Sequence, residues 1–270
     1  MPCQQLMTYT VKSEKVVTFI SHHFKHYLKH YRRAAFIHLS ALLCLIAFTA
    51  HQANAGEKVF TAIYASEYSG MDIEITRTLE FLGNNQYSYN FDADSALARI
   101  KESSRFTLVK GQYQPASYNY EKKVFGFGGK ESIKFNWESK QADYYKGGKK
   151  LHRHSIEQGV LDSSLYQLQL QRDLFHQQQS FSYRYIQRDK IKERSFRVTG
   201  NTTFTVGDKT YPALSLKRDS NDATTSTEII VIPELYYLIA QIEQEKDGST
   251  FQTRLKQVNL NAEKLAKLYQ

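Results

Sequence analysis

The sequence predicts a mainly β protein: a strongly curved antiparallel sheet or incomplete β-barrel, with one internal helix and a short C-terminal helix. Three observations lead to this fold class. Apolar and polar residues alternate along many segments, glycine-containing turns recur at short intervals, and a helical pattern fills one internal segment. Strands with one apolar and one polar face are typical of antiparallel sheets that are covered on one side.

The alternation is clearest in four segments, and the turns between segments support it. Apolar residues occupy every second position in or near residues 71–81, 87–91, 133–137 and 181–185. Glycine stands in three two-residue turns, where tight hairpins require a positive φ: 146–149, 206–209 and 246–249. We therefore expect about a dozen strands, with consecutive strands paired as a meander.

Two segments have helical spacing instead. Leu161–Gln177 places Leu165 and Leu168 on one face, and Asp162, Ser163 or Ser164 can cap its first turn. Residues 261–269 form a second, shorter helical segment. A sheet of so many strands has to curl or close, and we expect the internal helix to plug or cover its concave side.

The N-terminal segment has the anatomy of a secretory signal peptide. Arg32 and Arg33 precede an apolar run of 17 residues, and the small-residue motif Ala53-Asn54-Ala55 follows it. This order predicts cleavage after Ala55, so that the exported chain begins at Gly56. Residues 1–55 are thus expected to be a signal peptide with a long basic region, and residues 56–270 a single β-rich exported, periplasmic domain. The alternative is an uncleaved N-terminal helix that anchors the protein.

The composition of residues 56–270 argues against several classes of function. Residues 56–270 carry 30 Lys and Arg residues against 26 Asp and Glu, a mild positive balance that does not support nucleic-acid binding. They contain no cysteine, because Cys3 and Cys44 both precede Gly56. This composition excludes disulfides, thiol catalysis and cysteine-based metal sites in the exported part.

Several segments in a fixed order resemble a known family. These are Ser104–Tyr120, Phe135-Asn136-Trp137, the helix start Gly159–Leu165, and Ile232–Leu238. The order resembles the exported bacterial proteins grouped as domain of unknown function 3108, over roughly Tyr64–Val258. The resemblance implies an exported β-rich domain without an assigned activity. A weaker similarity of shape is to the periplasmic lipoprotein carriers, which wrap a curved sheet around an apolar cavity; that analogy does not fix function.

Aromatic residues are the best candidates for a binding surface. Tyr118, Phe135, Trp137 and Tyr183 lie on apolar strand faces and are predicted to line a cavity, although aromatic residues also simply favour strands. His152 and His154 share a strand face, but two imidazoles without a carboxylate pattern make a poor metal site, and we expect a surface pair. We predict no catalytic, cofactor or metal residues, since neither a G-x-S-x-G nor an H-E-x-x-H motif occurs.

The sequence therefore favours a non-catalytic binding or carrier-like protein of the cell envelope. Its expected ligand is lipid-like, apolar or amphipathic, and no cofactor is expected. The alternative is a structural or assembly factor of the envelope that pairs a sheet edge with another envelope protein. An outer-membrane barrel fits less well, because the chain ends in a polar helical segment.

Overall fold

The computed structural model describes residues 56–68, 70–219 and 225–270. The predicted signal peptide, with Ala53 and Ala55 of its cleavage motif, lies outside these residues, whereas Gly56 is the first of them. The helices of the described residues are too short and too polar to span a lipid bilayer.

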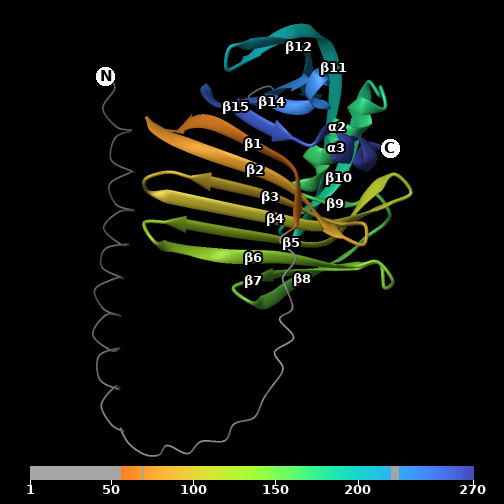
Figure 1. Cartoon of the computed structure of the whole chain (residues 1–270). Helices are drawn as coiled ribbons and strands as arrows, with labels where there is room; N and C mark the ends of the chain where they lie inside the picture. Colours follow the sequence, from red (N-terminus) through yellow and green to blue (C-terminus); the bar gives the residue numbers. More distant parts are fainter. Residues whose placement is uncertain (1–55, 69, 220–224) are drawn as a thin grey trace, which may run out of the picture. The chain divides into compact units, whose positions relative to one another are not determined.

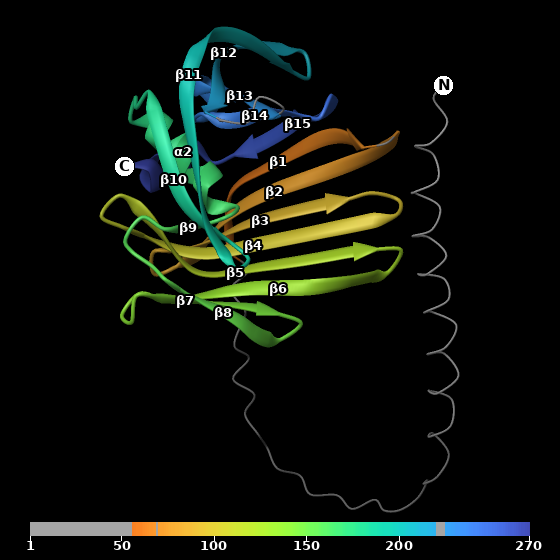
Figure 2. The same ribbon diagram turned by 180° about the vertical axis from the view of Figure 1, so that it is seen from behind.

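The described residues form one 15-stranded sheet (Figures 1 and 2). All neighbouring strands are antiparallel except β9 and β10, which are parallel. The strand bounds in chain order are β1 Glu57–Tyr68, β2 Met71–Gly83, β3 Gln86–Asp94, β4 Ala98–Val109, β5 Gln112–Val124, β6 Phe127–Asn136, β7 Gln141–Lys146, β8 Lys149–Ser155, β9 Leu161–Asp162, β10 Ser180–Gln187, β11 Lys190–Val206, β12 Lys209–Asp219, β13 Thr225–Ile232, β14 Leu238–Lys246 and β15 Ser249–Leu260.

The sheet is a meander in which the first and last strands of the chain, β1 and β15, are neighbours in the middle of the strand order. Its spatial order runs from β8 through β1, then from β15 back to β9. β1 pairs with β2 on one side and with β15 on the other, which sets Phe60 opposite Leu260. The edges are thus β8 and β9, and the curved sheet does not close. The predicted fold class, a strongly curved or incomplete barrel with two helices, is confirmed.

The hairpin turns lie where glycine predicted them. β7 and β8 are joined by Gly147 and Gly148, with φ of 57° and 79°. Asp247 and Gly248 join β14 to β15 with φ of 52° and 77°. A positive φ at both central residues matches the twist of the paired strands, and this conformation costs glycine little.

Helix α2, Leu165–Phe175, begins four residues later than the sequence predicted. Leu161 and Asp162 instead form β9 and pair with Tyr185 and Ile186 of β10. Asp162 still caps the helix: its Oδ1 accepts the backbone N–H groups of Ser164 and Leu165, at 3.0 and 2.8 Å. The carboxylate thereby satisfies donors that the first helical turn leaves free.

The two helices pack at one end of the curved sheet (Figures 1 and 2). Leu165 and Leu168 of α2 are fully buried against strands from both halves of the sheet. The C-terminal helix α3, Ala262–Tyr269, is capped by the side chain of Asn261 and buries Leu268 and Tyr269. The 3-10 turn η1, Pro233–Leu235, connects β13 to β14. The two helices and their buried side chains therefore close one end of the curved sheet.

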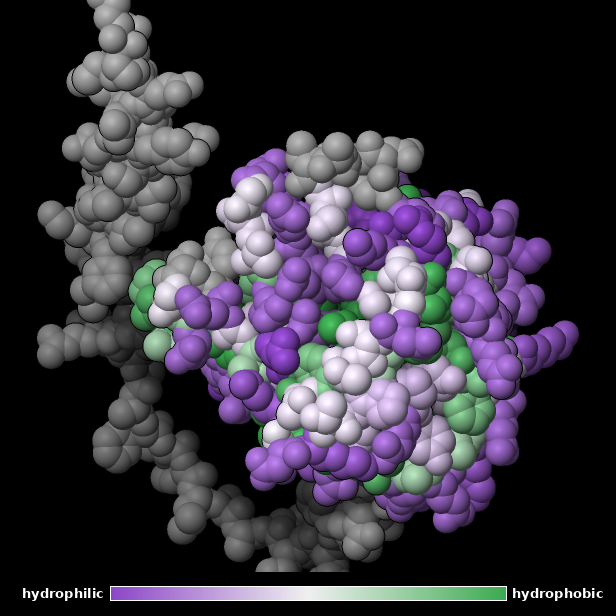
Figure 3. Space-filling view, turned by 90° about the horizontal axis from the view of Figure 1, so that it is seen from above, coloured by the Kyte–Doolittle hydropathy of each residue, from purple (hydrophilic) through white to green (hydrophobic). Residues whose placement is uncertain are grey.

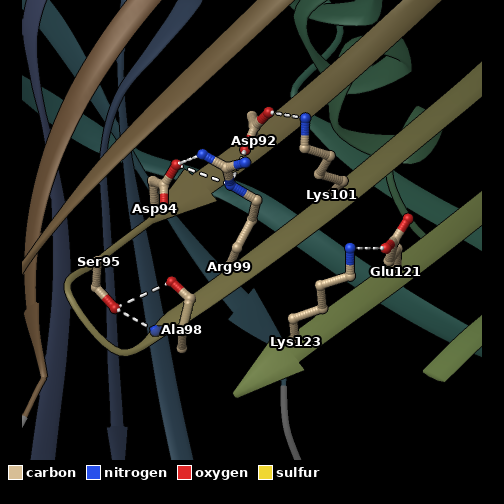
Figure 4. Close-up of polar contacts among 8 residues, drawn as sticks. All are labelled: Asp92, Asp94, Ser95, Ala98, Arg99, Lys101, Glu121 and Lys123. Carbon is tan, nitrogen blue, oxygen red and sulfur yellow. Dashed lines mark hydrogen bonds and ion pairs between the residues drawn. The ribbon is translucent and has the colours of Figure 1, made fainter. Parts of the chain in front are cut away.

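The outer face of the sheet is polar. On β3, β4 and β5, Lys101 pairs with Asp92 at 2.9 Å, Lys123 pairs with Glu121 at 2.9 Å, and Arg99 pairs with Asp94 (Figure 4). The view in Figure 3 likewise shows mostly hydrophilic residues, with smaller hydrophobic areas between them. The neighbours of these outward residues in sequence point inward, which leaves apolar side chains for the concave face.

Candidate functional site: an internal cavity

The concave face of the sheet borders a cavity of about 420 Å³. This volume lies within the roughly 300–1,000 Å³ that is usual for small-molecule sites. Strands from both halves of the sheet, β1–β8 and β9–β15, supply its walls. The first turn of α2, with Ser164, Tyr166 and Gln167, lines one end, which we call the inner end. The cavity is thus built by residues far apart in the sequence.

Most of the wall is apolar. Strict alternation along β2, β3 and β4 turns one set of side chains inward, and strands β6, β11, β13, β14 and β15 add a facing set. The apolar wall residues are Ile73, Ile75, Phe91, Ala93, Ile100, Ile133, Phe196, Ile229, Ile242 and Phe251. A mostly apolar surface of this kind favours a ligand with an apolar part.

A cluster of hydroxyl and carboxyl groups lies where α2 meets the cavity. Glu102 of β4 accepts hydrogen bonds from the Tyr118 hydroxyl, at 2.9 Å, and from the Ser164 hydroxyl. Burial, followed by the negative charge of Glu102, raises the pKa of Tyr118, so this phenol stays a donor. Glu102 therefore has two hydroxyl donors of its own within the wall.

Asp162 fixes the start of α2 from a fully buried position. Its Oδ1 also accepts the Ser104 hydroxyl at 2.8 Å, whereas its Oδ2 is buried without a hydrogen-bond partner among the described residues. Burial raises the pKa of Asp162 to about 6, although the three donors at Oδ1 act in the opposite direction. The cost of burying the charge thus exceeds the gain from its hydrogen bonds.

Two arginines also line the cavity beside α2. The Nη1 of Arg77 donates to the hydroxyl of Tyr89, at 3.1 Å, and to Oε1 of Gln167. The Nη1 of Arg194 donates to the hydroxyl of Tyr166. Both arginines are thus tied to adjacent residues of the first turn of α2.

These two arginines were not predicted from the sequence, although the strand patterns carry a signal for them. Arg77 falls in step with the inward-facing Ile73, Ile75 and Leu79, and Arg194 falls in step with Phe196. A charged residue in the apolar phase of an alternating strand points into the core or into a cavity. The pattern of each strand therefore marked these positions as unusual.

The four aromatic residues predicted to line a cavity occupy three different environments. Tyr118 is in the cavity wall. Phe135 and Trp137 stack at 6.1 Å and pack against a second core cluster, and the Trp137 Nε1 donates to the Pro115 carbonyl at 2.7 Å. Tyr183 packs against α2, where its hydroxyl donates to Asp173 at 2.8 Å. Of the four, Tyr118 alone borders this cavity.

The predicted surface histidine pair is half correct. The rings of His152 and His154 lie 4.5 Å apart, and His152 is exposed. His154 is buried instead, and its Nε2 lies 3.0 Å from the carbonyl oxygen of Arg188, in the turn between β10 and β11. Within the described ranges, no three His, Cys, Asp or Glu side chains gather in a way that could hold a metal ion.

Fold and site together define a barrel-like β protein with a mostly apolar internal cavity. The chain belongs to the family described as "Protein of unknown function (DUF3108)", whose model matches residues 64–256. The predicted resemblance to this family is thereby confirmed.

A comparison with solved structures supports the same architecture. The crystal structure of a beta-barrel-like protein of domain of unknown function DUF1849 from Brucella abortus matches with a TM-score of 0.51 and 8% sequence identity. The match covers 75% of this chain and 98% of that one, and at this identity it concerns the fold alone. The comparison with curated proteins gives no match.

Proposed function

We propose that this protein is an exported, non-catalytic binding or carrier-like protein that holds an apolar or amphipathic ligand in its cavity. The observation that carries the proposal is the cavity of about 420 Å³ between the two halves of the sheet. The mechanism is sequestration: apolar parts of the ligand leave water, at about 25 cal/mol per Å² buried. Each ~100 Å² of apolar ligand surface then contributes about 2.5 kcal/mol to binding.

Export to the periplasm is part of the proposal. It rests on the basic, apolar and small-residue order of Arg32–Gly56. β1 begins at Glu57, so cleavage after Ala55 leaves every strand of the sheet intact. An N-terminal anchor that is not cleaved is the other outcome, and the N-terminal sequence of the purified protein distinguishes the two.

Native mass spectrometry tests the carrier function directly. The protein is released from the cell envelope without detergent, and its mass is compared before and after extraction with organic solvent. We expect an extractable added mass on the folded chain. A folded chain that carries no added mass, and takes up none when mixed with amphiphiles, contradicts the proposal.

A matched pair of variants shows whether the ligand occupies this cavity. Ala93 lies opposite Ile75 in the sheet, and both line the cavity. Ala93→Trp fills part of the space, so we expect less bound ligand. Thr76→Trp is the control, because Thr76 is the next residue after Ile75 and faces the outer surface, where it should leave binding unchanged.

The alternative function, sheet-edge pairing with another envelope protein, has one feature in its favour: the sheet has two edges, β8 and β9. β9 has only two residues, and β8 has seven, including Lys149, Lys150 and Arg153. Short and positively charged edge strands resist pairing with further strands. The cavity therefore supports the carrier proposal better than the edges support this one.

A further inference from the structure

We propose that the cavity takes an amphipathic anion, whose carboxylate or phosphate group binds between Arg77 and Arg194 at the inner end while its apolar part lies along the isoleucine-rich wall. This inference rests on the proposed binding function and adds the chemical class of the ligand. The observation that carries it is that the guanidinium groups of Arg77 and Arg194 line the cavity without an ion-pair partner among the described residues.

Arg77 is a buried cation without a buried counterion. Its exposed fraction is 7%, and its Nε is buried without a hydrogen-bond partner in the described part of the chain. The partners of its Nη1 are a phenol and an amide, both neutral groups. Its guanidinium lies over the rings of Tyr64 and Phe91, at 5.5 and 5.4 Å. Removing such a charge from water is costly unless an opposite charge compensates it.

Arg194 presents a second guanidinium to the same space. It lies over the rings of Tyr166 and Tyr185, at 5.4 and 5.3 Å, and bonds the Tyr166 hydroxyl. None of the ion pairs among the described residues includes Arg194. Since Tyr166 and Gln167 are consecutive, α2 holds both guanidinium groups at one end of the cavity.

The carboxylates of the cavity wall already have other partners. Glu102 accepts hydrogen bonds from Tyr118 and Ser164 and forms no ion pair with Arg77 among the described residues. Burial acts to lower the pKa of Arg77, but the neighbouring Tyr89 and Tyr64, with a smaller contribution from Glu102, raise it above its ordinary value. Glu131 pairs with Arg188 at 3.2 Å, on the exposed side of the cavity. Because Arg188 and Glu131 pair with each other, Arg77 and Arg194 remain against Glu102, which leaves one positive charge in excess at the inner end.

A bound anion fits this arrangement. Guanidinium groups hold carboxylate and phosphate oxygens through paired, charge-assisted hydrogen bonds, and these bonds gain strength away from water. The rest of the wall is mostly apolar, so we expect the remainder of the ligand to be mostly apolar. A fatty-acid carboxylate and a lipid phosphate share this chemistry.

The test measures binding of four twelve-carbon probes to the full chain, after bound amphiphiles are removed on a hydrophobic resin. Dodecanoate and dodecyl phosphate are the anions, dodecanol is neutral, and dodecylamine is cationic. Isothermal titration should show that at least one anion binds about 10-fold or more tightly than dodecanol, and that dodecylamine binds weakest. The anion that binds more tightly identifies the source as a fatty acid or a phospholipid.

Variants then locate the charge. Arg77→Met and Arg194→Gln should each lower anion affinity about 10- to 100-fold and leave dodecanol affinity unchanged. Arg105→Gln is the matched control, because Arg105 is an exposed arginine of β4 outside the cavity wall. Binding of dodecanol shows that each variant still has a folded cavity.

Two failures remain distinguishable. If no probe binds the unmodified chain, the carrier function itself is contradicted. If dodecanol binds as tightly as both anions, or if Arg77→Met and Arg194→Gln both keep the full preference for anions, the carrier function stands and the anion site is overturned.

Discussion

The buried Asp162 should make the stability of this protein fall as pH rises from about 4 to about 6. Its pKa in the folded state is about 6, above its ordinary value of 3.8, because burial disfavours the charged form. The folded state therefore holds this proton more tightly than the unfolded state does. The stability that comes from the neutral carboxyl is complete below pH ~3.8 and is lost as pH rises through ~6.

The size of the effect follows from the shift of about two pKa units. Each unit corresponds to about 1.36 kcal/mol, so ionisation of Asp162 costs about 3 kcal/mol of unfolding free energy. The substitution Asp162→Asn removes the titration while its amide oxygen can still accept the N–H of Leu165. The pH dependence that comes from Asp162 should vanish in this variant.

Urea unfolding at half-unit steps between pH 4 and pH 7 measures this effect. The stability of the unmodified protein, minus that of Asp162→Asn, should fall by about 2.4 kcal/mol across this range, since part of the ~3 kcal/mol is already lost at pH 4. Burial also raises the pKa of Asp173, but this group titrates in both proteins and cancels in the difference. Parallel stability curves for the two proteins would refute the reasoning.

Three further predictions concern packing and caps. Leu168→Ala, in the buried face of α2, should lower the unfolding free energy by about 2–5 kcal/mol in urea titrations, and equal stability would contradict its place in the core. Asn261→Ala removes the acceptor for the Lys264 N–H at 3.1 Å and should cost about 0.5–2 kcal/mol by thermal unfolding, whereas Asn261→Ser should restore most of it. Trp137→Phe breaks the bond to the Pro115 carbonyl and should cost about 1–3 kcal/mol, measured by circular dichroism because the variant lacks the single tryptophan; no loss would show that this bond adds nothing.

Much of the fold was predictable because its signals are local. The alternation near Ile73–Leu79 fixes which side chains face inward, and the turn at Gly147 and Gly148 fixes a hairpin and its register. The start of α2 was predicted four residues too early, because the pairing of Leu161 with Tyr185 is tertiary and leaves no local pattern.

The site was less predictable, for a geometric reason. Alternation shows that a side chain faces inward, but a filled core and a cavity wall are both inward. Tyr118 and Tyr183 have the same pattern, yet one borders the cavity and the other packs on α2. Only the curvature of the whole sheet decides between these places. Arg77 is different, because its charge in an apolar phase is visible in the sequence.

The pairing of β1 with β15 also sets the order in which the molecule can be completed. The meander from β1 to β8 consists of neighbours in sequence, so it can form early in folding. One edge of β1 then stays unpaired until β15, the last strand to be synthesised, is available, since Phe60 pairs with Leu260. An unpaired edge is a template for strands of other chains. The edge most exposed to aggregation thus exists only in the unfinished chain, and a protein shortened by its last strand would keep that edge permanently.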